Sequence, residues 1–284
     1  MSATEALERR HEQTIVLRPP SGWTSVGLGE LWRFRELLFF LTWRDVKVRY
    51  KQTILGALWA LLQPFMTMIV FTFVFNHIGK IRAPAGIPYP LFALSGLAFW
   101  FYFTNSVNTA SGSLVANAPL ITKVYFPRLA VAISPLLAGI VDLALSLVLV
   151  AGVMAYYGFA PGPELLLLPA FLLLVVLTAL GVGLVLSALN VKYRDIRYVV
   201  PFVMQLWLYA SPVAYPSSFV HGTYRTLYDL NPMTGVIDGF RWTLLGVGAP
   251  HLGSLLVSIG AALVLVVLGS LYFARTERSF ADVI

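Results

Sequence analysis

Four basic residues stand close together ahead of the first long apolar run of the chain. Arg44, Lys47, Arg49 and Lys51 place four positive charges within eight residues. Guanidinium and ammonium groups pair strongly with phosphate oxygens, so this cluster could bind a phosphorylated ligand. The alternative is anchoring to anionic lipid, which contributes about 1 kcal/mol for each basic residue near the membrane surface.

The sequence carries none of the common motifs of catalysis, nucleotide binding or metal binding. It has no cysteine, which excludes Cys-based metal sites and nucleophiles. It contains no glycine-rich phosphate loop ending in Gly-Lys-Ser/Thr, no His-Glu-x-x-His and no Gly-x-Ser-x-Gly. Its four histidines stand apart in the sequence. We therefore expect this chain to bind no metal and no cofactor and to have no catalytic residue.

The chain as a whole has the composition of a membrane protein. Of the 284 residues, 58% are hydrophobic and 12% are charged, whereas soluble domains have about half and about a quarter. Apolar runs near the roughly 20 residues that a helix needs to cross a bilayer occupy about 55–77, 89–110, 129–157, 165–189, 199–215 and 252–273. The predicted fold is an all-α integral membrane protein with six transmembrane helices.

The segments around these six spans differ in character. Residues 1–28 are polar and predict a flexible cytoplasmic N-terminal tail without a cleavable signal peptide. Residues 29–52 alternate apolar and basic residues at helical spacing, which predicts an amphipathic helix in the membrane interface. The transmembrane domain extends over 53–275, and 276–284 form a cytoplasmic C-terminal tail. Residues 216–250 are apolar but broken by Pro and Gly, which predicts re-entrant extracellular half-helices before the last span.

The distribution of Lys and Arg predicts the orientation of the chain. Sixteen of the 20 lie in the two terminal segments and in the loops 111–128 and 190–198, and four lie in the loops on the other side. Cytoplasmic segments carry the excess of basic residues. Both termini are therefore predicted to be cytoplasmic. The net charge of +7 follows from the same pattern and does not indicate nucleic acid as a partner.

Two spans contain residues that are unusual in a membrane helix. Pro64 in the first span predicts a kink or a break. Asp142 is interpreted as the one carboxylate in the middle of the spans. Because a single carboxylate makes a poor proton relay, we expect Asp142 to pair with a hydroxyl or amide of a neighbouring helix. The scarcity of intramembrane charge argues against ion-coupled transport, so the driving energy should come from another chain.

Four segments resemble the type-2 ABC exporter permeases, and more narrowly the branch that exports O-antigen, teichoic acid or capsular polysaccharide. RDVKVRYKQTILGALWALLQP at 44–64 resembles the family's approach to its first membrane helix. NAPLITKVYFPR at 117–128 and LNVKYRDIRYVVP at 189–201 are similar to its two cytoplasmic loops. NPMTGVIDGFRWTLLG at 231–246 is similar to its re-entrant extracellular helices. The four occur in the family's order, and the resemblance covers the chain from Leu31 onward.

The resemblance implies a half-transporter that works as a homodimer with two copies of a separate ATPase subunit, which binds ATP and Mg²⁺. It implies export of a polysaccharide linked to a lipid diphosphate, with O-antigen expected first, across the bacterial inner membrane. The basic cluster would then capture the diphosphate headgroup. The first cytoplasmic loop would dock on the ATPase through its apolar side chains. The alternative is an interfacial loop that lies partly in the lipid. Its candidate coupling residues are Asn117, Leu120, Ile121, Lys123, Tyr125, Phe126 and Arg128.

Three aromatic residues are candidates for the lining of a sugar channel. Sugar rings present apolar C–H faces that stack on aromatic rings, and Tyr and Trp can also donate hydrogen bonds. Trp59, Tyr102 and Tyr209 lie deeper in the predicted spans than most other aromatic residues. The competing interpretation is the aromatic belt of a membrane protein or simple packing.

Two other functions compete with polysaccharide export. A permease that exports a drug or a lipid would share the six-span plan, but the short extracellular loops and the segment 44–64 favour the polysaccharide branch. A membrane-embedded enzyme acting on lipid-linked sugars would need acidic or His residues gathered near a membrane surface. The sequence offers no convincing cluster of that kind.

Overall fold

The computed structural model describes residues 28–51, 56–84, 86–124, 126–246, 248–277 and 280. Every regular element within these ranges is helical, which confirms the predicted all-α fold for this part of the chain. The predicted N-terminal tail, except Leu28, lies outside the described residues. So do Tyr125 of the predicted coupling loop and most of the predicted C-terminal tail.

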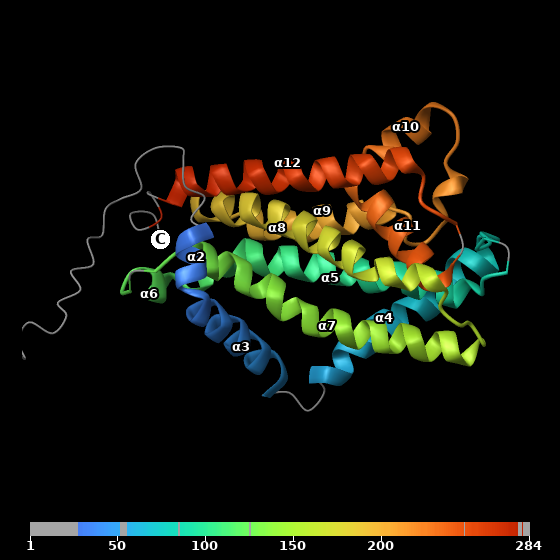
Figure 1. Ribbon diagram of the computed structural model, residues 1–284, viewed down its shortest axis with the longest axis horizontal. Helices are drawn as coiled ribbons and strands as arrows, with labels where there is room; N and C mark the ends of the chain where they lie inside the picture. The colour runs from blue at the N-terminus through green and yellow to red at the C-terminus, as the bar shows by residue number, and fades with distance from the viewer. Residues whose placement is uncertain are drawn as a thin grey trace, which may run out of the picture.

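Five helices run roughly along the long axis of the molecule (Figure 1). They are α5 (Tyr89–Ala116), α7 (Leu129–Tyr156), α8 (Leu168–Lys192), α9 (Ile196–Tyr209) and α12 (Leu252–Glu277). The short 3-10 helix η2 (Pro163–Leu167) leads into α8. Helix α5 packs against both α7 and α8, and α12 packs along α8. Because most side chains of α5 are buried, this helix forms the centre of the bundle.

Among the described residues, four helices are long and apolar enough to cross a bilayer. They are Leu58–Ile78, Leu129–Tyr156, Pro163–Lys192 and Leu252–Glu277, and they coincide with four of the six predicted spans. The other two predicted spans fall on α5 and α9. Helix α5 has 28 residues, about 42 Å at 1.5 Å per residue, but Ser, Thr and Asn in its second half lower its hydropathy. Helix α9 has 14 residues, which is short for a full span.

The first apolar run forms α4 (Gly56–Phe71) and continues as the π-helical segment η1 (Thr72–Ile78). Helix α4 passes through Pro64 without the break that the sequence suggested as one outcome. Proline cannot donate to the carbonyl four residues earlier, here that of Ala60, so one helical hydrogen bond is missing. Membrane helices accept this loss where neighbouring polar groups can satisfy the freed carbonyl.

The N-terminal helices α2 (Leu28–Arg33) and α3 (Arg35–Lys51) lie at one end of the molecule, near α6 (Ala118–Ile121) and the C-terminal end of α12 (Figure 1). Helix α3 packs on α7. Leu37, Leu38 and Leu41 of this helix pack into one apolar cluster of the protein. That the helix lies in the membrane interface stays a prediction. Leu41 is buried, whereas Phe39, Phe40 and Trp43 are exposed on the isolated chain. The helix therefore presents apolar side chains both to the protein and away from it.

The broken segment before the last helix folds into η3 (Ser217–Phe219), α10 (Thr223–Asp229) and α11 (Pro232–Leu245). Helix α10 lies at the opposite end of the molecule from α2 and α6 (Figure 1). Helix α11 packs against α5, α8 and α12, and most of its side chains are buried. It begins where the Asn231 side chain accepts a hydrogen bond from the Met233 amide at 3.0 Å. It ends at Gly246, whose φ of 64° suits glycine.

The buried apolar residues form two clusters. The larger cluster surrounds α5 and extends toward α11. The smaller one joins α3, α5, α7, α8, α12 and the loop around α6, and includes Leu41, Leu114, Ile121, Phe126 and Phe273. The smaller cluster therefore fixes the first interhelical loop and the N-terminal helices to the end of the bundle.

Candidate functional site

A cavity of about 520 Å³ lies among the end of α3 and the helices α4, α5 and α7. Its volume falls within the range of small-molecule sites, about 300–1,000 Å³. The apolar part of the cavity wall includes Pro64, Phe101, Pro135 and Leu143. Polar side chains in the wall are those of Arg49, Gln63, Asn105, Ser106, Asn108, Thr109, Asp142 and Ser146. A cavity with this many amides and hydroxyls can bind a polar ligand next to the apolar bundle.

Helical spacing brings the polar residues of this cavity together. Residues three or four positions apart on a helix share a face, as do Asn105, Asn108 and Thr109 on α5. Asp142 and Ser146 are related in the same way on α7. Each helix therefore turns one short polar strip toward the cavity. Sequence analysis missed this strip, although the spacing of the α5 residues was a visible signal.

An ion pair joins α3 to α7 in the wall of the cavity. The Arg49 guanidinium and the Tyr50 hydroxyl both donate hydrogen bonds to the Asp142 carboxylate. Burial raises the pKa of the Tyr50 phenol, against the lowering effect of Arg49, so the phenol keeps its proton and remains a donor. The hydroxyl partner expected for Asp142 is therefore present, and an arginine is added to it. Arg49, a candidate for headgroup capture, already has a carboxylate partner.

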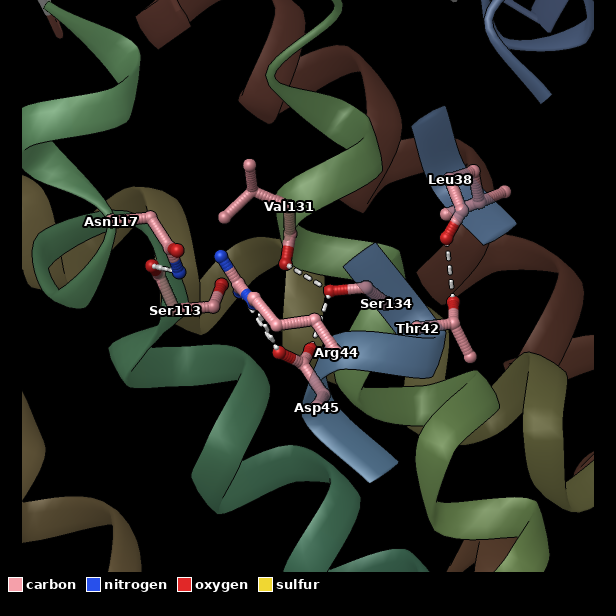
Figure 2. A network of polar contacts seen from close by, with 8 residues as sticks. All are labelled: Leu38, Thr42, Arg44, Asp45, Ser113, Asn117, Val131 and Ser134. Carbon is pink, nitrogen blue, oxygen red and sulfur yellow. Dashed lines mark hydrogen bonds and ion pairs between the residues drawn. The ribbon is translucent and has the colours of Figure 1, made fainter. Parts of the chain in front are cut away.

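A second polar contact holds α3 to α7 nearer the N-terminus of α3 (Figure 2). Asp45 lies between Arg44, at 2.8 Å, and the Ser134 hydroxyl, which donates to it at 2.8 Å. Ser134 also lies 3.4 Å from the Val131 carbonyl, which loses its helical donor because Pro135 has no N–H. These contacts keep the middle of α3 attached to α7.

The four residues of the basic cluster therefore differ in their surroundings. Arg44 and Arg49 pair with carboxylates. Lys47 and Lys51 are exposed, and the Lys47 ammonium lies 5.4 Å from the centre of the Trp43 ring. Only Arg49 lines the cavity. Capture of a diphosphate by the cluster stays a prediction.

Two of the three aromatic candidates meet at the cavity. Trp59 of α4 and Tyr102 of α5 both line it. Tyr102 is buried, and its hydroxyl donates to the Leu136 carbonyl at 3.2 Å. Tyr209 lies near the end of α9, is half exposed and does not line the cavity. A shared path for all three aromatic side chains is therefore not formed within one chain.

The predicted coupling loop is less exposed than its apolar composition suggested. Ile121 and Phe126 are each only 6% exposed because they pack into the smaller apolar cluster. Leu120 packs partly against the same cluster. Arg128 donates to the backbone carbonyl of Glu277 at the end of α12, and Asn117 donates to the Ser113 carbonyl at 2.8 Å. These residues fix the loop to the helical bundle of its own chain.

The surface left for a partner on this loop is smaller and lies between the fixed residues. Lys123 is exposed, and Val124 is 53% exposed. Thr122 and Pro119 are exposed beside them. Tyr125 lies outside the described residues. Docking on an ATPase stays a prediction. Lys123 and Val124 are exposed and could contact the ATPase, whereas Ile121 and Phe126 are buried.

A buried ion pair in α11 was not expected from the sequence. Arg241 lies 3.5 Å from Asp238, donates to the Val213 carbonyl at 3.2 Å, and stacks over the Phe92 ring at 3.7 Å. Its Nε also lies 3.4 Å from the Ser95 hydroxyl. Asp142 is therefore not the only charged group in the apolar interior. Opposite charges three positions apart on one helix were the signal for this pair.

The described residues contain no group of three or more His, Asp or Glu side chains placed to hold a metal ion. The chemistry of the cavity is therefore that of hydrogen bonds, one ion pair and aromatic faces. Such a site can bind a ligand that carries both hydroxyls and negative charge.

The helical bundle, its apolar spans and this polar cavity agree with the family to which the sequence belongs. Residues 36–245 match the ABC-2 type transporter family. Because the match covers most of the chain, this protein is a member of that family of multi-pass membrane permeases. The matched range begins in α3 and ends with α11, so it contains all the cavity residues.

Several curated proteins are similar to this chain over most of its length. The O-antigen export system permease protein RfbA of Myxococcus xanthus is 29% identical, covering 89% of this chain and 97% of the relative. The protein of the same description from Klebsiella pneumoniae is 26% identical, covering 88% and 95%. The polysialic acid transport protein KpsM of Escherichia coli is 26% identical, covering 72% and 78%.

Proposed function

We propose that this chain is the membrane permease subunit of an ATP-driven exporter of a lipid-diphosphate-linked polysaccharide, with O-antigen as the polymer. The observation that carries the proposal is the alignment with O-antigen export permeases over nearly their whole length. The weaker and shorter match to a polysialic acid transport protein favours the O-antigen branch over a capsular one. The polar, aromatic-walled cavity supports a saccharide as the cargo.

The proposed topology has six spans with both termini in the cytoplasm of the inner membrane. Helices α5 and α9 supply the two spans that apolar length alone does not reveal. Helices α2 and α6 and the C-terminal end of α12 lie at one end of the bundle (Figure 1), which agrees with a cytoplasmic side rich in Lys and Arg. Helices α10 and α11 would be the re-entrant pair, entering from the outside and returning to it.

The proposed assembly is a homodimer of this chain with two copies of an ATPase subunit that binds ATP and Mg²⁺. The absence of a nucleotide-binding loop in the sequence supports a separate source of energy. Exposed apolar side chains on α4, η1 and α9, such as Trp59, Phe73, Phe202 and Leu206, offer surface to lipid and to a second copy. Lys123 and Val124 would contact the ATPase.

Loss of the chain from its source bacterium tests the proposed function. We expect the deletion strain to lose surface polysaccharide and to accumulate the lipid-linked polymer inside the cell, because synthesis continues without export. Gel analysis of surface polysaccharide and extraction of the lipid-linked pool would measure both effects. Expression of the intact chain from a plasmid should restore export.

The alternative functions predict other outcomes for the same strain. A drug or lipid exporter would leave the surface polysaccharide unchanged after deletion. An enzyme acting on lipid-linked sugars would change the structure or amount of the polymer that is made, with no intact polymer accumulating inside. Either result would contradict the proposal.

A further inference from the structure

We propose that the cavity between α4, α5 and α7 binds the sugar that adjoins the diphosphate of a lipid-linked saccharide, and that Arg49 exchanges Asp142 for this diphosphate when the ligand binds. The inference rests on the proposed function and deepens it. In the absence of ligand, the Asp142 carboxylate binds Arg49 in place of the diphosphate. Residues of α5 form the subsite for the sugar.

The ion pair has the position that such an exchange requires. Arg49 and Asp142 both line the cavity, and their side chains are 31% and 18% exposed. A partly exposed ion pair is held weakly. A diphosphate carries more negative charge than one carboxylate, and its oxygens match the two-pronged geometry of a guanidinium. A ligand in the cavity can therefore compete with Asp142 for Arg49.

The remaining wall of the cavity has unused capacity for hydrogen bonds. Within the described part of the chain, the buried side-chain oxygen of Asn108 has no hydrogen-bond partner. Buried polar atoms normally have one. Sugar hydroxyls both donate and accept, so they can satisfy this oxygen as well as the amide of Asn105. The ring of Trp59 lies in the same wall and offers a face for the apolar side of a sugar.

The exchange would also change how α3 is held. Arg49 and Tyr50 bind the last turn of α3 to Asp142, whereas Asp45 and Ser134 bind the helix further back. Release of Asp142 loosens only the end of α3 and leaves its middle attached to α7. Ligand binding is thereby coupled to the segment that leads into the first membrane helix.

Opposite substitutions at the ion pair give the main test. We would measure the Kd of the purified permease–ATPase complex in nanodiscs for a polyprenyl diphosphate that carries one sugar. Arg49→Ala removes the phosphate partner, and we expect it to raise Kd about tenfold or more. Asp142→Asn removes the competing anion while keeping the size of the side chain, and we expect it to lower Kd several-fold.

A purely structural ion pair predicts a different pattern. Both substitutions would then break the same contact and change Kd in the same direction, or not at all, and either result would overturn the proposal. Arg35→Ala removes an exposed arginine at the start of α3, beside Trp32, and should leave Kd unchanged. Size-exclusion chromatography checks the assembly of each complex, and Arg49→Lys should give an intermediate Kd if a variant at 49 assembles poorly.

A second probe tests the sugar subsite. Wild-type complex should bind the sugar-bearing lipid more tightly than the same polyprenyl diphosphate without sugar. Asn108→Leu, of nearly the same size, should reduce this preference about fivefold to tenfold and leave binding of the sugar-free lipid unchanged. Equal losses for both probes would contradict a sugar site at Asn108.

The failure of this inference can be distinguished from failure of the proposed function. If cells need the chain for export but these substitutions do not alter binding as described, the cavity assignment is wrong and the function stands. If deletion of the chain leaves surface polysaccharide intact, the function is wrong, and the assignment of the cavity to a lipid-linked saccharide is rejected with it.

Discussion

Charged side chains that lie among the helices of this protein are held by groups from other segments. Arg49 reaches from α3 to Asp142 of α7, and Arg241 of α11 contacts Phe92 of α5 and the Val213 carbonyl. Arg241 is only 4% exposed, so removal of one partner from its ion pair leaves the other charge without compensation in an apolar environment, which costs more than the contact itself contributes.

Truncation of Arg241 should therefore destabilise the protein strongly. Arg241→Ala leaves Asp238 buried and unpaired, and we expect a loss of about 3–5 kcal/mol. Thermal unfolding in detergent, followed by fluorescence-detected size exclusion, would show the change. The double variant Asp238→Leu with Arg241→Leu removes both charges and should recover part of the loss. If the single variant were as stable as wild type, the pair would have no structural role.

Sequence patterns predicted the contacts of individual residues only in part. The chemistry expected around Asp142 was correct in kind, because a lone carboxylate in an apolar helix requires a hydrogen-bond donor. Its partners were not predicted, because Arg49 and Tyr50 lie more than 90 positions away in the sequence. The cavity was missed for the same reason, since its wall comes from four helices.

At the scale of the element, the closest contact between long helices joins α8 to α12. A Cβ added at Gly181 would lie 2.6 Å from the backbone carbon of Leu265, and Gly269 faces the Gly181 carbonyl in the same way. Small residues at such crossings let two backbones approach closely inside a membrane.

Gly181→Ala should destabilise the bundle by about 1–3 kcal/mol, because the added methyl group forces the two helices apart. Gly152→Ala is the matched control in another long helix, where an added Cβ meets nothing within 4 Å. That variant should gain about 0.5–1 kcal/mol from the lower conformational freedom of alanine. Thermal unfolding of both proteins would test the contrast, and equal stabilities would contradict it.

The loop between α5 and α7 separates into a structural and an exposed part, and substitutions should distinguish them. Phe126→Ala opens a space in the smaller apolar cluster and should cost the permease about 3–5 kcal/mol. Val124→Asp changes an exposed residue, so it should leave stability within about 0.5 kcal/mol but weaken copurification of the ATPase. Full retention of the ATPase by Val124→Asp would exclude this side chain from the docking surface.

Of the six spans predicted from apolar length, four coincide with described helices that are long and apolar enough to cross a bilayer, whereas those at 89–110 and 199–215 do not. Residues 89–110 belong to α5, which can carry Ser, Thr and Asn because protein rather than lipid surrounds much of it. The region 216–250 has too many Pro and Gly residues for a periodic pattern, although α11 is buried and well defined at both ends. Its packing depends on α5, α8 and α12, which no local pattern contains.

At the scale of the whole molecule, the proposed orientation can be tested because the chain contains no cysteine. Lys123→Cys and Tyr224→Cys place one thiol at each end of the bundle, at exposed positions. In intact spheroplasts, a membrane-impermeant maleimide should label Cys at 224 and should label Cys at 123 only after the membrane is permeabilised. The reverse pattern would show that the termini lie outside.

Export itself is the central claim, and reconstitution tests it most directly. Proteoliposomes containing this chain and its ATPase would receive a lipid-linked saccharide, and the fraction of saccharide that crosses the bilayer would be measured with an impermeant lectin before and after ATP is added. We predict transfer that requires ATP and stops when the nucleotide-binding lysine of the ATPase is replaced. Transfer at the same rate without ATP or without this chain would contradict the account.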